Sequence, residues 1–297
     1  MITGACAGAR LRARLRAPVS ALVFAAFIGG VGTAPAAAQQ RPIVTEDPET
    51  IGAGRILLEG GIEYGGGVEF PIYGLKGDLW RVPALGVSIG ISSIAELQID
   101  SGYSHLHATS REPAPLAPIL DFQGDHTSSV EDVVLATKVR VLAEGTNRPS
   151  FAIRIATKLP NARNQSGLGT DMTDVSLAML VGKTIRSIRV VGNLGIAVIG
   201  DPTQAAVQYD PAIFGLSLAR ALAPGFDVVT EIEGRWQAYK DTPQPAAENR
   251  AALRGGLRYT RGAVRVDAGL RTGFGDVEPG IGFTTGVTWV ADAFTVP

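Results

Sequence analysis

The clearest pattern in the chain is a two-residue alternation over residues 226–237. Phe226, Ile232 and Trp236 fall on one side, whereas Glu231 and Glu233 fall on the other. Because a strand directs successive side chains to opposite faces, this segment predicts a strand with one apolar and one charged face. In a soluble sandwich the apolar face would be the core, whereas in an outer-membrane barrel it would meet lipid.

The same alternation recurs along the chain and predicts about twelve strands, each long enough to cross a bilayer at a tilt of about 45°. They cover residues 55–64, 84–91, 95–103, 132–142, 151–159, 171–184, 187–199, 212–221, 226–237, 250–260, 263–271 and 280–291. The connections alternate between long and short, and residues 65–78 and 105–129 are interpreted as irregular loops. A soluble sandwich has no reason to sort its loops in this way.

We therefore predict an all-β protein that forms a single antiparallel transmembrane β-barrel of about twelve strands, with short periplasmic turns and long external loops. Closure is required because lipid offers no hydrogen-bond partner for a free sheet edge. The outward positions are mostly small or aliphatic in mid-strand, and aromatic residues lie nearer the strand ends. These residues predict an interfacial girdle: Tyr64, Tyr103, Phe151, Trp236, Tyr259, Phe283 and Trp289.

The first 38 residues have the composition of a cleaved secretory signal peptide. Four arginines between Arg10 and Arg16 precede an apolar run at 17–28, which is too short to span a bilayer, and a small-residue cleavage site follows at 36–38. The predicted domains are therefore 1–38 as signal peptide, 39–54 as a periplasmic lead-in, and 55–297 as the barrel. This organisation predicts export to the outer membrane of a Gram-negative bacterium.

Composition narrows the possible functions. Cys6 is the one cysteine of the chain and lies upstream of the apolar run, so a mature chain has no disulfide or thiol chemistry. Without the four signal arginines, 23 basic residues face 28 acidic ones, a net charge of −5. This balance gives no indication of nucleic-acid binding. The expected partners are outer-membrane lipid, the barrel-assembly machinery during biogenesis and a small-molecule solute, with no cofactor.

The inward positions of the predicted strands carry many charges, and adjacent strands tend to place acids opposite bases. Two interpretations remain open: a water-filled conduit whose charges select small polar or anionic solutes, or an interior closed by salt bridges. The predicted lumen-lining residues are Glu59, Glu63, Glu96, Asp100, Lys138, Arg140, Arg154, Lys158, Glu231, Glu233, Arg235, Arg254, Arg258, Arg265, Asp267 and Arg271.

Histidine chemistry is the main alternative to a channel. His105 and His107 follow Ser104, and Asp125 and His126 fall in the same predicted loop. Such residues can bind a metal or form a Ser–His pair. Loop geometry fixes no third ligand, however, so we predict no metal site and no enzyme activity.

Three short segments resemble a known family. They are Lys158-Leu159-Pro160-Asn161, then residues 167–174 (Gly-Leu-Gly-Thr-Asp-x-Thr-Asp), and Gly192-Asn193-Leu194-Gly195. They are similar to the outer-membrane barrel transporters labelled for the meta-pathway of phenol degradation. The resemblance implies an outer-membrane channel and supplies neither a substrate nor functional residues.

The leading hypothesis is an outer-membrane channel for passive passage of small polar, aromatic or anionic solutes. One alternative is a hydrophobic-compound transporter of the fatty-acid type, which would need an N-terminal plug, and residues 39–54 are short for that role. The other alternative is a non-conducting structural barrel, favoured if the lumen charges pair completely.

Overall fold

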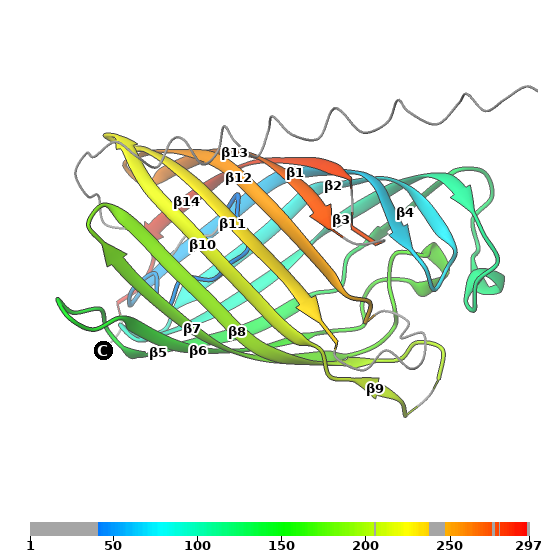
Figure 1. Ribbon diagram of the computed structural model, residues 1–297, viewed down its shortest axis with the longest axis horizontal. Coiled ribbons are helices and arrows are strands. Elements are labelled where there is room, and N and C mark those ends of the chain that lie inside the picture. The colour runs from blue at the N-terminus through cyan, green and yellow to red at the C-terminus, as the bar shows by residue number, and fades with distance from the viewer. Residues whose placement is uncertain (1–40, 205, 238–246, 275–276, 279, 296–297) are drawn as a thin grey trace, which may run out of the picture. The chain divides into compact units, whose positions relative to one another are not determined.

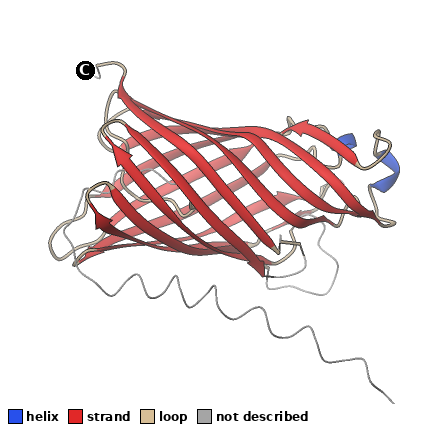
Figure 2. Cartoon of the chain, turned by 90° about the horizontal axis from the view of Figure 1, so that it is seen from above, coloured by secondary structure: helices blue, strands red, loops and turns tan. Residues whose placement is uncertain are grey.

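The computed structural model describes residues 41–204, 206–237, 247–274, 277–278 and 280–295, so the predicted signal peptide at 1–38 lies outside the described residues. The described chain is a closed antiparallel β-barrel (Figures 1 and 2). Each strand pairs with its neighbour in sequence, and the ring closes because β1 pairs with β14. Within the described residues, no helix is long and apolar enough to span a membrane.

Twelve strands make up the ring, as the alternation predicted. They are β1 (Arg55–Phe70), β2 (Leu75–Gly90), β3 (Ala95–Arg111), β5 (Val134–Leu142), β6 (Ser150–Lys158), β7 (Asp174–Ile185), β8 (Ile188–Gly200), β10 (Ala212–Ala223), β11 (Phe226–Trp236), β12 (Arg250–Arg261), β13 (Val264–Phe274) and β14 (Ile281–Asp292). Two short strands, β4 (His126–Val130) and β9 (Gln208–Tyr209), extend single neighbours, and η1 (Ala117–Ile119) and η2 (Asn164–Ser166) lie in loops.

The hairpin of β1 and β2 corrects one predicted loop. Residues 65–78 were expected to be irregular, yet β1 runs to Phe70 and β2 begins at Leu75, so the turn is residues 71–74. The misleading signal was a run of glycines at 65–67, where the strand register shifts between Gly65 and Val68. A bulge absorbs an extra residue without ending the strand, and glycine suits that position.

The longest predicted loop is also partly strand. β3 continues to Arg111 and pairs with β4, so residues 105–111 and 126–130 form a hairpin beyond the main ring. The segment between them packs on the hairpin's inward side, where Leu116, Leu120 and Phe122 contact a buried cluster around Leu106. Alternation continues through these strands, but three prolines downstream masked it.

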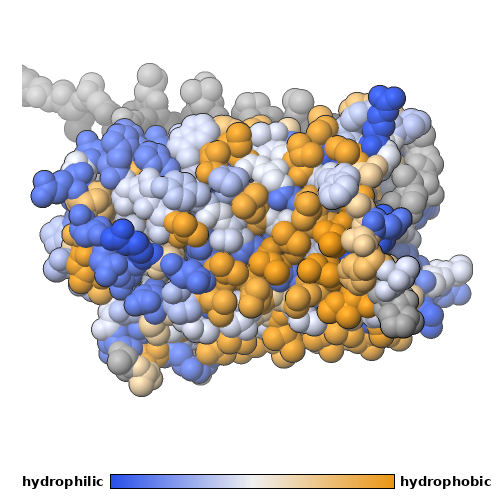
Figure 3. All heavy atoms as spheres, turned by 180° about the vertical axis from the view of Figure 1, so that it is seen from behind, coloured by the Kyte–Doolittle hydropathy of each residue, from blue (hydrophilic) through white to orange (hydrophobic). Residues whose placement is uncertain are grey.

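The outer surface carries the apolar belt that a lipid-facing barrel needs. Leu135, Ile155, Leu177, Met179 and Ile196 all point outward and are more than one third exposed. Figure 3 shows apolar side chains gathered over one face, with hydrophilic side chains at the left-hand end, where the long loops lie. Several predicted girdle residues are also exposed, namely Tyr103, Trp236, Tyr259 and Trp289.

The N-terminal segment is the main departure from the sequence-based expectation. Residues 39–54 were assigned to the periplasm, whereas the described residues 41–51 run through the barrel and bond to its inner wall. We call residues 41–51 the strap. Its partners lie on β1, β3, β5, β6, β8, β11, β12, β13 and β14. A polar, proline-bearing segment gives no periodic signal, so nothing local to it indicates where it docks.

Candidate functional site

Glu46 holds the strap at the centre of the barrel. Its carboxylate lies 3.2 Å from the Lys138 ammonium and 3.2 Å from the Arg154 guanidinium. Its backbone N–H donates to the Asn193 side-chain oxygen at 2.7 Å, and the Asn193 amide donates back to its carbonyl at 2.8 Å. Lys138 is fully buried and also pairs with Glu96 at 3.0 Å. A buried ammonium between two carboxylates is well compensated, whereas one left alone would be costly.

Glu231 is the second anchor of the strap. Its carboxylate accepts the N–H groups of Val44 and Thr45, each at 2.8 Å, and the Thr45 hydroxyl at 2.6 Å. Three donors to one carboxylate on a buried strand position fix the local backbone of the strap. The carboxylate therefore receives hydrogen bonds from the strap while Arg254, 3.3 Å away, balances its charge.

Acidic residues on the strap pair with arginines that lie nearer the end of the barrel with the short turns. Asp47 makes a two-pronged pair with Arg189, with distances of 2.9 and 2.6 Å, and Glu49 pairs with Arg140. Planar guanidinium groups favour such bidentate contact with carboxylates. Each of these pairs joins the strap to a different strand, β8 or β5.

Arg41, at the other end of the strap, lies in a space made by glycines. A Cβ atom at Gly61 would lie 2.1 Å from its guanidinium, and one at Gly286 would lie 2.5 Å from it. These two glycines are direct partners on β1 and β14. Arg41 donates to the Thr284 hydroxyl at 2.8 Å and lies 3.4 Å from Glu63. The small residues thus admit a large cation to the barrel wall.

Cross-strand pairing within the wall follows the predicted pattern of acid opposite base. Glu96 faces Lys138, Glu63 faces Arg81 and Glu231 faces Arg254 in the strand register. The corresponding ion-pair distances are 3.0, 2.9 and 3.3 Å. Because the partners are directly opposite each other on neighbouring strands and both point inward, they form ion pairs along the wall and do not reach across the lumen.

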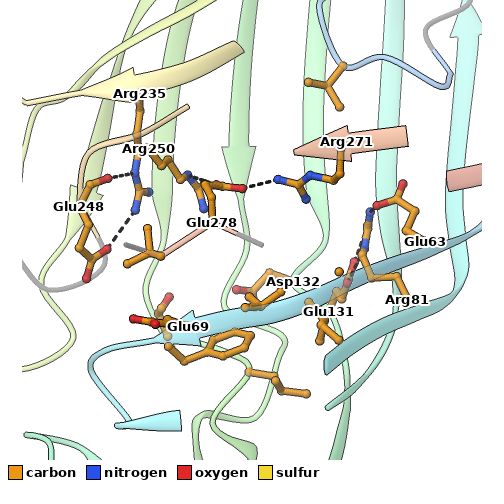
Figure 4. A pocket seen from close by; sticks show the side chains of 18 of the residues that line it. Glu63, Glu69, Arg81, Glu131, Asp132, Arg235, Glu248, Arg250, Arg271 and Glu278 are labelled. Carbon is orange, nitrogen blue, oxygen red and sulfur yellow. Dashed lines mark hydrogen bonds and ion pairs between the residues drawn. The ribbon is translucent and has the colours of Figure 1, made fainter. Parts of the chain in front are cut away.

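On the loop side of the strap lies a cavity of about 630 Å³, which we call the vestibule. Arginines from β11, β12 and β13 reach its wall and pair with acids from the loops (Figure 4). Arg235 pairs with Glu248, and Arg250 and Arg271 both pair with Glu278. Of these three arginines Arg250 is the most solvated, with 47% of its side chain exposed.

Val44 is the residue of the strap that borders the open part of the lumen. Its side chain is 46% exposed although it lies inside the barrel. It borders the vestibule, a second cavity of about 350 Å³ and a third of about 210 Å³. A small apolar side chain thus stands where three cavities meet.

The structure sorts the predicted lumen residues into groups. Glu63, Lys158, Glu233, Arg235, Arg254 and Arg271 line the vestibule, and Glu59 and Asp100 line the 210 Å³ cavity. Arg140, Arg154, Glu231 and Lys138 bind the strap, with Glu96 paired to Lys138. Arg258, Arg265 and Asp267 are buried in the wall, where Arg258 donates to the Arg41 carbonyl and Asp267 lies 3.7 Å from Arg41.

Several site residues were missed by sequence reasoning. Arg81 and Glu131 bridge the vestibule wall with a distance of 2.5 Å, and both fell in or beside predicted loops. Arg250 was inside a predicted strand, but its pairing with Glu278 depends on a loop. Arg189 lies at an inward position of the predicted strand 187–199, so side-chain parity alone could have identified it.

Among the ionisable groups outside the membrane-spanning strands, Tyr73 and Glu144 have shifted pKa values. Burial, followed by the carboxylates of Asp171 and Asp132, raises the pKa of Tyr73 to about 12. For Glu144, burial acts to raise the pKa, but the Thr184 N–H and the cations Lys183 and Arg189 together lower it below 4.5. Both groups therefore keep their ordinary charge at neutral pH.

The histidines lie on strands rather than in a loop. His105 and His107 are on β3, and His126 is on β4 directly opposite His107. The three imidazoles are stacked, with interplanar angles of 16°. Among the described residues, no group of three His, Cys, Asp or Glu side chains is placed so that it could hold a metal ion.

No family model matches the sequence, and no curated protein matches it. The fold is similar to an outer membrane channel from Pseudomonas putida F1, with a TM-score of 0.60 and 12% identity over 82% of this chain and 98% of that chain. The NanC porin gives 0.49 with 8% identity over 79% and 98%, and the NalP autotransporter translocator domain from Neisseria meningitidis gives 0.47 with 14% over 80% and 88%. The first likeness supports an outer-membrane type of barrel, and the phenol-pathway label stays a prediction.

Proposed function

We propose that the protein is an outer-membrane channel for small polar solutes and that the strap sets its narrowest point. The observation that carries this proposal is the position of Val44, exposed inside the barrel where three cavities meet. Solutes enter the charged vestibule from the loop end, and passage depends on the space left beside this side chain. No covalent step is involved.

Single-channel conductance of the refolded mature protein in planar bilayers tests the proposal. Val44→Trp fills the meeting point of the cavities, so conductance falls by roughly half or more, whereas Val44→Gly raises it. Val139→Trp is the matched control, because Val139 faces outward on β5 and its replacement leaves the lumen unchanged. Equal conductance for all three variants would remove the strap from the pathway.

A second candidate function is transport of hydrophobic compounds. This function needs an N-terminal plug, and the strap is an N-terminal segment inside the barrel, although residues 39–54 are short for that role. The vestibule also has an apolar side, formed by Phe70, Ile72, Leu79 and Leu168. Uptake of an apolar solute into proteoliposomes, without ion current through either Val44 variant, would favour this candidate. Absence of both uptake and current from folded protein would leave a structural barrel.

A further inference from the structure

The two ends of the barrel differ in the charge of their connecting segments. At the end with the long loops, which we call the loop end, the connections carry carboxylates such as Asp121, Asp125, Glu131 and Asp171. Arg163 is the one lysine or arginine among the described residues that connect strands there. At the opposite end, which we call the turn end (left in Figure 1), arginines are exposed instead. Short turns keep their side chains close to the membrane surface, where charge decides which lipid headgroups are attracted.

Three arginines are exposed at the turn end. Arg148 lies in the β5–β6 turn, Arg186 lies in the β7–β8 turn, and Arg261 is the last residue of β12. None of the three has an ion-pair partner among the described residues, whereas Glu144, in the same turn as Arg148, pairs with Arg189 at 2.6 Å. The three guanidinium groups therefore suit a ligand that brings its own negative charge.

Arg261 lies on the lipid-facing surface itself. It shares the outward face of β12 with Tyr259, because side chains two residues apart on a strand point the same way. Tyr259 contacts Phe226, with ring centroids 4.4 Å apart. On the other side, Val264 pairs with both Arg261 and Trp289 in the strand register, so these three residues form one row across β12, β13 and β14. Aromatic residues mark the headgroup level of a bilayer, which places the Arg261 guanidinium at that level.

Arg186 occupies a backbone position that favours other residues. The β7–β8 hairpin turns at residues 186–187, and Arg186 has a φ of 57°. Two-residue turns with this left-handed backbone favour glycine, asparagine and aspartate. The cation directly follows Ile185, which is 57% exposed on the outer surface. Arg148 likewise comes three residues before Phe151, an outward residue of β6, so both cations lie at the edge of the apolar belt.

We propose that Arg148, Arg186 and Arg261 bind the phosphate groups of anionic phospholipids in the membrane leaflet at the turn end. A guanidinium group binds a phosphate through two parallel N–H···O bonds. Its methylene stem lies along apolar surface while the charged end reaches the headgroups. A soluble acidic partner would not require these cations to lie beside lipid-facing aromatic residues, so the membrane is the favoured source of the phosphate.

The test measures which phospholipid lies next to Trp289 in refolded mature protein in vesicles. Trp80 and Trp236 are replaced by phenylalanine, so that Trp289 is the remaining tryptophan of the chain. Brominated phosphatidylglycerol and brominated phosphatidylcholine each quench its fluorescence on contact. We expect the anionic lipid to compete about fivefold better, and this preference weakens as salt is added. Arg261→Gln removes the preference, whereas Arg261→Lys keeps most of it because the charge is retained.

Arg163→Gln is the matched control, because it removes an equal charge at the loop end, where 68% of the Arg163 side chain is exposed. It leaves the lipid preference at Trp289 unchanged. Native mass spectrometry extends the test to the other two arginines. Protein in which Arg148, Arg186 and Arg261 are all changed to glutamine retains fewer phosphatidylglycerol molecules than the unsubstituted protein.

Heat-modifiable migration on gels establishes that each variant is folded. Equal quenching by both lipids in folded protein overturns the proposal, and so does a preference that Arg261→Gln leaves intact. Either result would assign the exposed arginines to a soluble acidic partner instead. Equal retention of phosphatidylglycerol by the triple variant would likewise exclude Arg148 and Arg186 as lipid ligands.

Discussion

The strap region and the vestibule use the same charged residue types under different conditions. Around the strap, Lys138 and Glu96 are fully buried and each charge has a close partner. In the vestibule, Arg250 pairs with Glu278 at 3.5 Å while almost half of its side chain stays exposed. Breaking a buried pair is costly, whereas a solvated pair contributes little. The first region is therefore suited to hold the barrel interior, and the second is suited to meet solutes.

The sharpest way to break this comparison is to remove one buried charge. Lys138→Met leaves Glu46 and Glu96 without their shared cation, and we expect a loss of about 3–5 kcal/mol in the free energy of unfolding. The matched change in the vestibule, Arg250→Met, costs no more than about 1 kcal/mol. Urea unfolding of both variants in lipid vesicles measures the difference. Similar losses would show that the two regions are equivalent.

Ion selectivity gives the second test. Arg254 borders the vestibule and the 210 Å³ cavity, so Arg254→Gln should lower anion preference by roughly twofold in reversal-potential measurements. Arg258 is buried and bonded to the Arg41 carbonyl. Arg258→Gln should therefore reduce stability while the selectivity of the channels that fold stays the same. A selectivity change of equal size in both variants would contradict this division.

The smallest expected effect is the titration of Glu144 at the turn end. Its folded pKa lies below 4.5, so its contribution to stability is present above pH 4.5 and is lost as pH falls through the folded value. A ¹³C carboxyl titration should find the midpoint below 4.5. Lys183→Met should move that midpoint upward, because one of the lowering cations is removed. A midpoint at or above 4.5 in the unsubstituted protein would refute the assignment.

Local alternation was sufficient to predict the ring of strands. In β11, Ile232 and Glu231 differ in environment because adjacent side chains point to opposite faces, and that rule needs no long-range information. The same parity put Glu96 and Lys138 on the inward faces of neighbouring predicted strands, whereas Arg81, the partner of Glu63, lay outside every predicted strand. The bulge in β1 was harder to predict than the strands, because the glycines at 65–67 give the same sequence signal as a loop.

The sequence by itself determined which faces are apolar and charged, how many strands the barrel has and which neighbouring strands exchange charges. Only the tertiary structure decided where the strap lies, because Glu46 meets Lys138 and Asn193 across 92 and 147 residues of chain. It also decided that His126 lies beside His107, since this depends on the length of a hairpin that prolines obscured. Side-chain parity is a property of a few consecutive residues, whereas these contacts depend on how the closed barrel brings distant segments to one point.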